Sequence, residues 1–371
     1  QKRGDEAGDV VGSSILLFAL LGAAVTVVMQ FAAPSIASVM QAPAQAYDST
    51  VGYMRICSAG SLFIVAYNVI GSIFRGLGNS RLPLLTVAIA CVANILGDLL
   101  LVGVFHMASA GAAIATVAAQ AVSVVISLLV IRRQGLPFPF EKSHVRFQKA
   151  LVGRVVKLGL PIAFQDVLVS ISFLAITAIV NGLGVIPSAG VGVAEKICGF
   201  IMLVPSAFSQ SISAFVAQNI GAEKPERAKK ALLYSVLVSL GVGVVMGYLS
   251  FFHGDLLAGL FNRDAAVIAA GADYLKAYAI DCLLVSFMFC FTGYFNGCGK
   301  TAFVMVQGIA GAFGVRLPMS FLMSRISPVS LFRIGLATPS STLLQIFLCV
   351  GYYWLLGRKE RRKRLEISPG T

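Results

Sequence analysis

The stretch "GYFNGCGKT" at residues 293–301 ends in Gly-Lys-Thr, the tripeptide that closes a phosphate-binding loop. Such a loop also needs a glycine at its first position, where the backbone turns its N–H groups toward the phosphates. Tyr294 occupies that position, and the preceding "LLVSFMFCFT" is a continuous apolar run without strand alternation. We therefore expect the tripeptide to belong to a turn and not to a nucleotide site.

The composition around this stretch indicates a membrane protein. Hydrophobic residues make up 57% of the 371 residues and charged residues 12%, and the mean hydropathy is +0.86. Soluble domains contain roughly a quarter charged residues, so this chain has too few to cover a globule of its size. The predicted fold class is all-α, a polytopic membrane protein.

Apolar stretches long enough to cross about 30 Å of hydrocarbon recur along the whole chain. The predicted spans are 10–31, 51–74, 82–104, 109–131, 159–181, 188–216, 231–252, 268–296, 301–323 and 329–356.

The positive charges are concentrated in alternate connections between these spans. The net charge is +13, and one set of connections holds nearly all of the lysine and arginine, including the tail "GRKERRKRLE". The other set offers only Arg263 and Arg325. By the positive-inside rule both termini are predicted to be cytoplasmic, in a bacterial cell membrane. Basic residues confined to short loops also argue against nucleic-acid binding.

An internal repeat explains the opening stretch. "FRGLGNSRLP" at 74–83 carries Gly-x-Gly ending at Gly78, and "FNGCGKT" carries it ending at Gly299, an offset of 221 residues. "YMRI" from Tyr53 matches "YLKA" from Tyr274 at the same offset, and "QKRGDEA" from Gln1 resembles "QNIGAEK" from Gln218. Glycine permits left-handed backbone angles, so each Gly-x-Gly is predicted to form a tight cytoplasmic turn between two spans.

The repeat also predicts the organisation of the lobes. Two spans precede Gln218 and none precedes Gln1, so we expect an N-terminally truncated chain carrying ten of twelve transmembrane helices in two pseudo-symmetric lobes. The predicted parts are an N-lobe at 1–131 without its first two helices, a cytoplasmic linker at 132–158, a six-helix C-lobe at 159–356 and a basic cytoplasmic tail at 357–371.

Ionisable residues at membrane depth are costly and indicate function. In "NILGD", Asn94 and Asp98 are four residues apart and share one helix face. A carboxylate beside an amide oxygen suits Na⁺, and a buried carboxylate can instead carry a proton. Thr116 of the next span could complete this cation site, unless Asp98 only pairs with a polar group to hold helices together.

The C-lobe has a different polar set, because the 221-residue offset places Val315 and Met319 opposite Asn94 and Asp98. Its substrate cavity is predicted to be lined by acidic and amide side chains that would meet cationic substrates. Asp281 and Arg316 could alternatively form a structural pair. The predicted cavity residues are Gln165, Asp166, Glu195 and Asp281.

Several segments resemble the multidrug and toxic compound extrusion (MATE) family. They are "FVAQNIGAEKPERAKKAL" (215–232), "FRGLGNSRLP", "CFTGYFNGCGKTAFVMVQG" and "GLATPSSTLLQIFLCVGYY" (335–353), and the similarity covers essentially the whole chain. The resemblance implies a secondary antiporter that exports amphipathic, often cationic, organic compounds in exchange for Na⁺ or H⁺. It places Asn94, Asp98 and Thr116 at a family cation site, and Asp166 near a family acid on the seventh helix.

The resemblance further implies a transporter and not an enzyme, without a cofactor beyond the coupling ion. Its partners would be a small organic molecule and the bilayer, and we expect a monomer. Two alternatives stay open: a lipid-linked saccharide flippase of the same superfamily, and a non-transporting membrane protein. A flippase would line its cavity with basic residues, whereas the residues predicted here are acidic or neutral.

Overall fold

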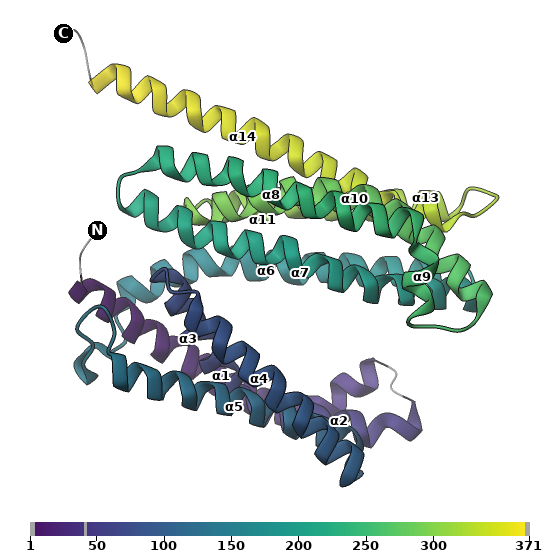
Figure 1. The fold of residues 1–371 in the computed structure, drawn as a ribbon, viewed down its shortest axis with the longest axis horizontal. Coiled ribbons are helices and arrows are strands. Elements are labelled where there is room, and N and C mark those ends of the chain that lie inside the picture. The colour runs from purple at the N-terminus through teal and green to yellow at the C-terminus, as the bar shows by residue number, and fades with distance from the viewer. Residues whose placement is uncertain (1–3, 41–42, 368–371) are drawn as a thin grey trace. The chain divides into compact units, whose positions relative to one another are not determined.

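The computed structural model describes residues 4–40 and 43–367, which form helices and contain no strands (Figure 1). The predicted all-α class is confirmed. Contacts divide the chain into two compact units, Gln1–Val156 and Lys157–Thr371. Gln1, the first member of the Gln1/Gln218 match, and the last residues of the predicted tail, 368–371, lie outside the described residues.

Unit 1 consists of five α-helices, a π-helical turn and a 3₁₀ turn among its described residues. They are α1 (Gly4–Val39), α2 (Ala44–Ala59), α3 (Ser61–Gly76), α4 (Arg81–Asp98), the π-helical η1 (Leu99–Val104), α5 (Ala108–Gln134) and the 3₁₀ turn η2 (Lys142–His144).

Unit 2 contains the remaining helices. They are α6 (Lys149–Asn181), which begins just before the unit boundary, α7 (Val185–Gly221), α8 (Pro225–Phe252), α9 (Gly254–Gly259), α10 (Ala265–Gly297), α11 (Thr301–Gly311), the π-helical η3 (Ala312–Arg316), α12 (Leu317–Ser324), α13 (Leu331–Gly335) and α14 (Ala337–Ile367).

The helices reproduce the predicted spans. Among the described residues, nine helical segments are long and apolar enough to cross a membrane, and the bent pair α2–α3 makes a tenth when counted as one span. Most run several residues beyond the predicted limits. A helix can continue past the apolar stretch because its backbone hydrogen bonds are satisfied within the helix, in hydrocarbon and in the interface alike.

The two Gly-x-Gly turns have the same backbone geometry. Gly78 has a φ of 82° and Gly299 a φ of 70°, so both adopt the left-handed conformation expected of glycine. The Asn79 N–H donates to the Phe74 carbonyl at 2.9 Å, and the Lys300 N–H donates to the Phe295 carbonyl at 2.8 Å. These bonds close the ends of α3 and α10 in the same way, which confirms the prediction of a turn.

Replacement of Gly299 by alanine should therefore lower stability. Its added Cβ would make an ordinary contact, 3.7 Å from Leu158 Cδ2, so the cost is the left-handed backbone, about 1–2 kcal/mol. Gly241→Ala, within α8, should instead raise the free energy of unfolding by up to about 1 kcal/mol. Thermal unfolding in detergent measures both effects. If the unfolding midpoints of the two variants shifted in the same direction, the left-handed backbone at Gly299 would not be the cause.

The repeat extends to the contacts between helices. A Cβ added to Gly22 of α1 would meet the Val65 side chain of α3 at 3.4 Å. At the 221-residue offset, a Cβ on Gly243 of α8 would meet Ser286 Oγ of α10 at 2.6 Å. Both helix pairs thus cross at equivalent glycines, and α1 and α3 are the counterparts of α8 and α10.

The units differ at Gly60, where the predicted continuous span 51–74 is broken. Helices α2 and α3 meet there at 51°, whereas their counterpart α10 is one continuous helix. The Val117 side chain occupies the space that a Cβ of Gly60 would need. Glycine is a weak helix former, and this close contact fixes the bend. The residue opposite Gly60 in the repeat is Asp281.

Candidate functional site

In unit 1, α4 and α5 bring together two of the three predicted cation-site residues. The Asn94 Nδ2 donates to Thr116 Oγ1 at 3.3 Å, and the Thr116 hydroxyl donates to the Ala112 carbonyl at 2.9 Å. The helices approach closely because Gly97 faces Ala115, whose Cβ would lie 2.9 Å from a Cβ added at that glycine. Small residues at a helix crossing permit such an approach in membranes.

Asp98 lies one turn further along α4, on the face that carries Asn94. It is the last α-helical residue before η1, and it is half-buried. Its Oδ1 is inaccessible to solvent and has no hydrogen-bond partner among the described residues. π-Helical segments occur frequently at functional sites, and a carboxylate oxygen without a partner can accept either a cation or a proton.

Gln120 is a polar neighbour that the sequence reasoning missed. It lies one turn beyond Thr116 on α5, and its Oε1 is buried without a hydrogen-bond partner among the described residues. The signal was the i, i+4 spacing from Thr116, the same spacing that singled out Asn94 and Asp98. The oxygen-bearing side chains on facing sides of α4 and α5 are therefore Asp98, Asn94, Thr116 and Gln120.

In unit 2, Glu195 of α7 is half-buried and receives a hydrogen bond from Thr177 of α6. The Thr177 Oγ1 lies 3.2 Å from Glu195 Oε1. Thr177 was not predicted as a site residue, because a threonine within a span usually bonds its own backbone. It does so here as well, with its hydroxyl 3.0 Å from the Phe173 carbonyl.

Asp281 of α10 and Arg316 of η3 are both buried, with side chains 2% and 5% exposed. They lie close enough for electrostatic attraction, but no ion pair within 4.0 Å joins them among the described residues. The Arg316 guanidinium instead donates to Ser172 Oγ at 3.4 Å and lies 4.4 Å from the centre of the Phe173 ring. Asp281 Oδ1 has no hydrogen-bond partner among the described residues.

Gln165 and Asp166 are adjacent on α6 but have different surroundings. Gln165 packs against Gly308, where an added Cβ would lie 2.5 Å from its Nε2. Asp166 is exposed, and in the described structure its carboxylate forms no hydrogen bond or ion pair. Asp166 thus differs from the half-buried Glu195 and the buried Asp281 in its exposure.

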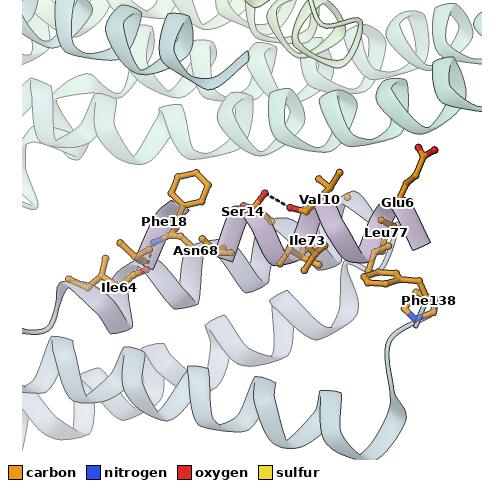
Figure 2. Close-up of a pocket in the computed structure, with 16 residues that line it drawn as sticks. Glu6, Val10, Ser14, Phe18, Ile64, Asn68, Ile73, Leu77 and Phe138 are labelled. Carbon is orange, nitrogen blue, oxygen red and sulfur yellow. Dashed lines mark hydrogen bonds between the residues drawn. The ribbon is translucent and has the colours of Figure 1, made fainter. Parts of the chain in front are cut away.

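A large cavity lies in unit 1, between α1 and α3 (Figure 2). Its volume is 1260 Å³, and no predicted site residue lines it. The lining residues are Glu6, Ala7, Val10, Val11, Ser14, Phe18, Ile64, Val65, Asn68, Val69, Ser72, Ile73, Gly76, Leu77, Pro137 and Phe138.

No cluster of three or more His, Cys, Asp or Glu side chains that could hold a metal ion occurs among the described residues. A cation bound beside Asp98 would therefore need amide, hydroxyl or backbone oxygens as its other ligands. Such hard oxygen ligands suit an alkali cation better than a transition metal.

Sequence comparison relates the chain to multidrug transport proteins. A family model described as MatE matches residues 1–100 and 161–322. The probable multidrug resistance protein YoeA of Bacillus subtilis (strain 168) is 24% identical over 363 residues, covering 96% of this chain and 78% of that protein. The multidrug export protein MepA of Staphylococcus saprophyticus is 23% identical over 309 residues, which cover 82% of this chain and 67% of that protein.

Solved structures share the fold. An outward-facing multidrug resistance MATE family transporter of the MOP superfamily has a TM-score of 0.89 at 18% identity, covering 97% of this chain and 80% of that one. A MATE crystal structure in complex with MaL6 has a TM-score of 0.87 at 18% identity, and the match covers 96% of this chain and 80% of that one.

Proposed function

Because the chain belongs to the multidrug and toxic compound extrusion (MATE) family of membrane transporters, we propose that it is a secondary antiporter. It exports amphipathic organic compounds, often cationic, and takes up Na⁺ or H⁺ in exchange. Its relatives are named for probable multidrug resistance and for multidrug export. The exchange mechanism and the substrate class rest on the side chains described above.

The observation that carries the proposal is the contrast between the acids of the two units. Asp281 of unit 2 has the buried Arg316 nearby as a positive charge. Asp98 of unit 1 has no basic side chain in an ion pair among the described residues, and its Oδ1 has no hydrogen-bond partner there. A charge within a membrane span costs at least about 2.5 kcal/mol. A bound cation or proton would remove that cost, which favours Asp98 as the coupling group.

Asn94 and Thr116 supply the further oxygens of this coupling site. Their side chains are held together by the 3.3 Å hydrogen bond, and both belong to helices that cross closely at Gly97. Na⁺ would be coordinated by the Asp98 carboxylate with the Asn94 and Thr116 side-chain oxygens. H⁺ would require the Asp98 carboxylate alone.

Glu195 and Asp166 are the residues proposed to meet a cationic substrate in unit 2. Glu195 keeps its carboxylate partly accessible while Thr177 holds one oxygen, and Asp166 is exposed. Asp281 is more deeply buried, so it would act on a substrate through its charge and not by contact. Gln165, packed on Gly308, would contribute a neutral polar surface.

Coupling to an ion gradient would supply the work of export. One charge moving through 100 mV of membrane potential provides about 2.3 kcal/mol, enough to concentrate an uncharged solute about fiftyfold. Export of a singly charged cation in one-for-one exchange moves no net charge, so its work would come from the concentration gradient of the ion. We propose that the protein does this as a monomer in the cell membrane, with cytoplasmic termini, without a cofactor and without enzymatic activity.

Transport by everted membrane vesicles tests the proposal. Vesicles containing the protein should accumulate ethidium, a planar organic cation, when Na⁺ or H⁺ is more concentrated in the vesicle lumen than outside, because the lumen of an everted vesicle corresponds to the cell exterior. Accumulation should stop when an ionophore collapses the gradient. Ethidium accumulation that is the same with and without either gradient would contradict antiport. Movement of a lipid-linked saccharide in place of ethidium would contradict the assignment to organic compounds.

A further inference from the structure

A cluster of polar side chains joins α1 to both halves of the broken span α2–α3, at the bend beside Gly60. We propose that Thr26 of α1 is a positioning residue of the coupling site for Na⁺. It holds the end of α2 at this bend, and the bent span in turn holds the part of α5 that carries Thr116. The inference rests on the proposed function, because it concerns the cation site of the antiporter, and it adds a residue that itself touches no cation.

Thr26 contacts one residue on each side of the bend. Its Oγ1 lies 2.9 Å from the Ser58 carbonyl oxygen of α2 and 2.6 Å from Ser61 Oγ of α3. The Ser61 hydroxyl can donate to Thr26 while the Thr26 hydroxyl donates to the Ser58 carbonyl, so that each proton is used once. Both hydroxyls also lie within hydrogen-bond distance of the Gly22 carbonyl oxygen of α1. One threonine therefore ties α2 and α3 to α1 at the point where the span is broken.

Gln30, one turn further along α1, binds the same end of α2. Its Nε2 donates to the Arg55 carbonyl at 2.8 Å and to Ser58 Oγ at 3.0 Å. The carbonyl groups in the last turn of a helix, which here include that of Ser58, have no regular donor within the helix, and hydrocarbon supplies none. Thr26 supplies such a donor from α1, and with Gln30 it stabilises a helix end inside a span.

The equivalent positions of unit 2 lack these polar groups, and the equivalent helix is continuous. The four polar residues of unit 1 have apolar or small counterparts at the 221-residue offset: Gly247 for Thr26, Phe251 for Gln30, Ala279 for Ser58 and Cys282 for Ser61.

This correspondence also holds in three dimensions. A Cβ added to Gly247 of α8 would lie 3.0 Å from the Ala279 carbonyl oxygen and 3.7 Å from Cys282 Cβ, both on α10. Gly247 thus faces the same two places on α10 that Thr26 faces on α2 and α3. In the described chain the polar cluster and the break occur together in unit 1, whereas unit 2 has neither at these positions.

The bent span packs on α5 beside the coupling site. The Ser109 Oγ of α5 donates to the Ser49 carbonyl of α2 at 3.3 Å. At the other end of α2, Val117 of α5 fills the space beside Gly60. These two contacts lie on either side of Thr116 along α5, so the angle of α2 determines where this part of α5 is held.

Thr116 supplies one side of the coupling site. It accepts the hydrogen bond from Asn94 of α4, the helix that also carries Asp98. If α2 straightened, its contacts with α5 would shift, and the Thr116 hydroxyl would move relative to α4. A binding site needs its ligands held within about 0.5 Å of the productive geometry. Loss of the Thr26 hydroxyl should therefore weaken Na⁺ binding more than it slows transport at saturating Na⁺.

Na⁺-driven ethidium transport in everted vesicles tests the inference. For Thr26→Val the half-saturating Na⁺ concentration should rise about tenfold, the scale on which one lost hydrogen bond acts, while the maximal rate per folded protein stays near that of the wild type. Thr26→Ser keeps the hydroxyl and should restore the wild-type concentration. A purely structural role would lower the amount of folded protein and leave the half-saturating concentration unchanged, and that result would overturn the proposal.

Thr50→Val is the matched control. Thr50 is also a half-buried threonine of unit 1, but in the described structure its hydroxyl bonds to the Ala46 carbonyl of its own helix, at 2.8 Å. Its replacement should leave the half-saturating Na⁺ concentration unchanged. Gln30→Leu removes both bonds to α2 and should act in the same direction as Thr26→Val. An equal rise for Thr50→Val, or no rise for both Thr26→Val and Gln30→Leu, would contradict the role of the cluster.

Cross-linking of α2 to α5 provides a readout that does not depend on transport. Cysteines that replace Ser49 and Ser109 should be joined by a short bifunctional reagent in membranes, because these residues are in contact. The single replacements measure the background from the seven native cysteines. Addition of Thr26→Val should lower the yield several-fold, whereas addition of Thr50→Val should not. An unchanged yield with Thr26→Val would overturn the inference whatever the transport result.

The two readouts separate failure of this inference from failure of antiport. Ethidium transport driven by H⁺ but not by Na⁺ would overturn the role of Thr26 in Na⁺ binding and leave antiport standing. Transport that is the same with and without either gradient would contradict antiport, and the cross-linking yield would then still decide whether Thr26 holds α2 against α5.

Discussion

Asp98→Asn should abolish gradient-driven efflux while leaving the protein folded. The asparagine side chain has the same shape, but it cannot carry the charge that binds Na⁺ or release the proton that would be exchanged. Ethidium accumulation in everted vesicles should fall to the level of vesicles without the protein. The unfolding midpoint should stay the same or rise, because the substitution removes an ionisable group from a membrane span.

Asp255→Asn provides the matched control for this prediction. Asp255 is an exposed carboxylate in the first turn of α9, so its loss changes the net charge equally without touching the α4–α5 polar cluster. Efflux by this variant should equal that of the wild type. Efflux by Asp98→Asn at the wild-type rate, under either gradient, would remove Asp98 from the coupling site.

Arg316→Met should strongly destabilise the protein. The arginine is 5% exposed and lies near the 2% exposed Asp281, so its removal leaves an uncompensated charge in the interior of unit 2. Breaking a buried ion pair costs about 3–5 kcal/mol, and because Arg316 and Asp281 are not in direct contact, the cost here should lie at or below that value. The expected result is a large fall in the unfolding midpoint in detergent, together with loss of the contact to Phe173.

The double variant Arg316→Met with Asp281→Asn distinguishes charge from packing. It removes both charges, so most of the lost stability should return, since replacing a buried pair with neutral groups is often close to neutral in stability. Arg325→Met is the control. Arg325 also contacts an aromatic ring, with its guanidinium 4.8 Å from the Phe321 ring centre, but it lies near the end of its span. Its replacement should therefore change the unfolding midpoint little. A double variant no more stable than Arg316→Met would show that Asp281 and Arg316 do not interact.

Hydropathy and spacing were sufficient to predict the spans, the class of fold and the duplicated turns. These features are local. A span requires only enough consecutive apolar residues to cross the bilayer with its backbone groups bonded internally, and the turns at Gly78 and Gly299 require only a left-handed residue. The pairing of Asn94 with Thr116 was also predictable, because consecutive spans joined by a short loop pack as neighbours.

The bend at Gly60, the bond from Thr177 to Glu195 and the burial of Asp281 beside Arg316 were decided by tertiary packing. Each depends on which side chain of a distant helix faces the position: Val117 at Gly60, Thr177 at Glu195, and Ser172 and Phe173 at Arg316. Hydropathy cannot rank these partners, since all the helices are apolar. The shapes of small and large residues at each crossing select them, and shape complementarity exists only once the helices are packed.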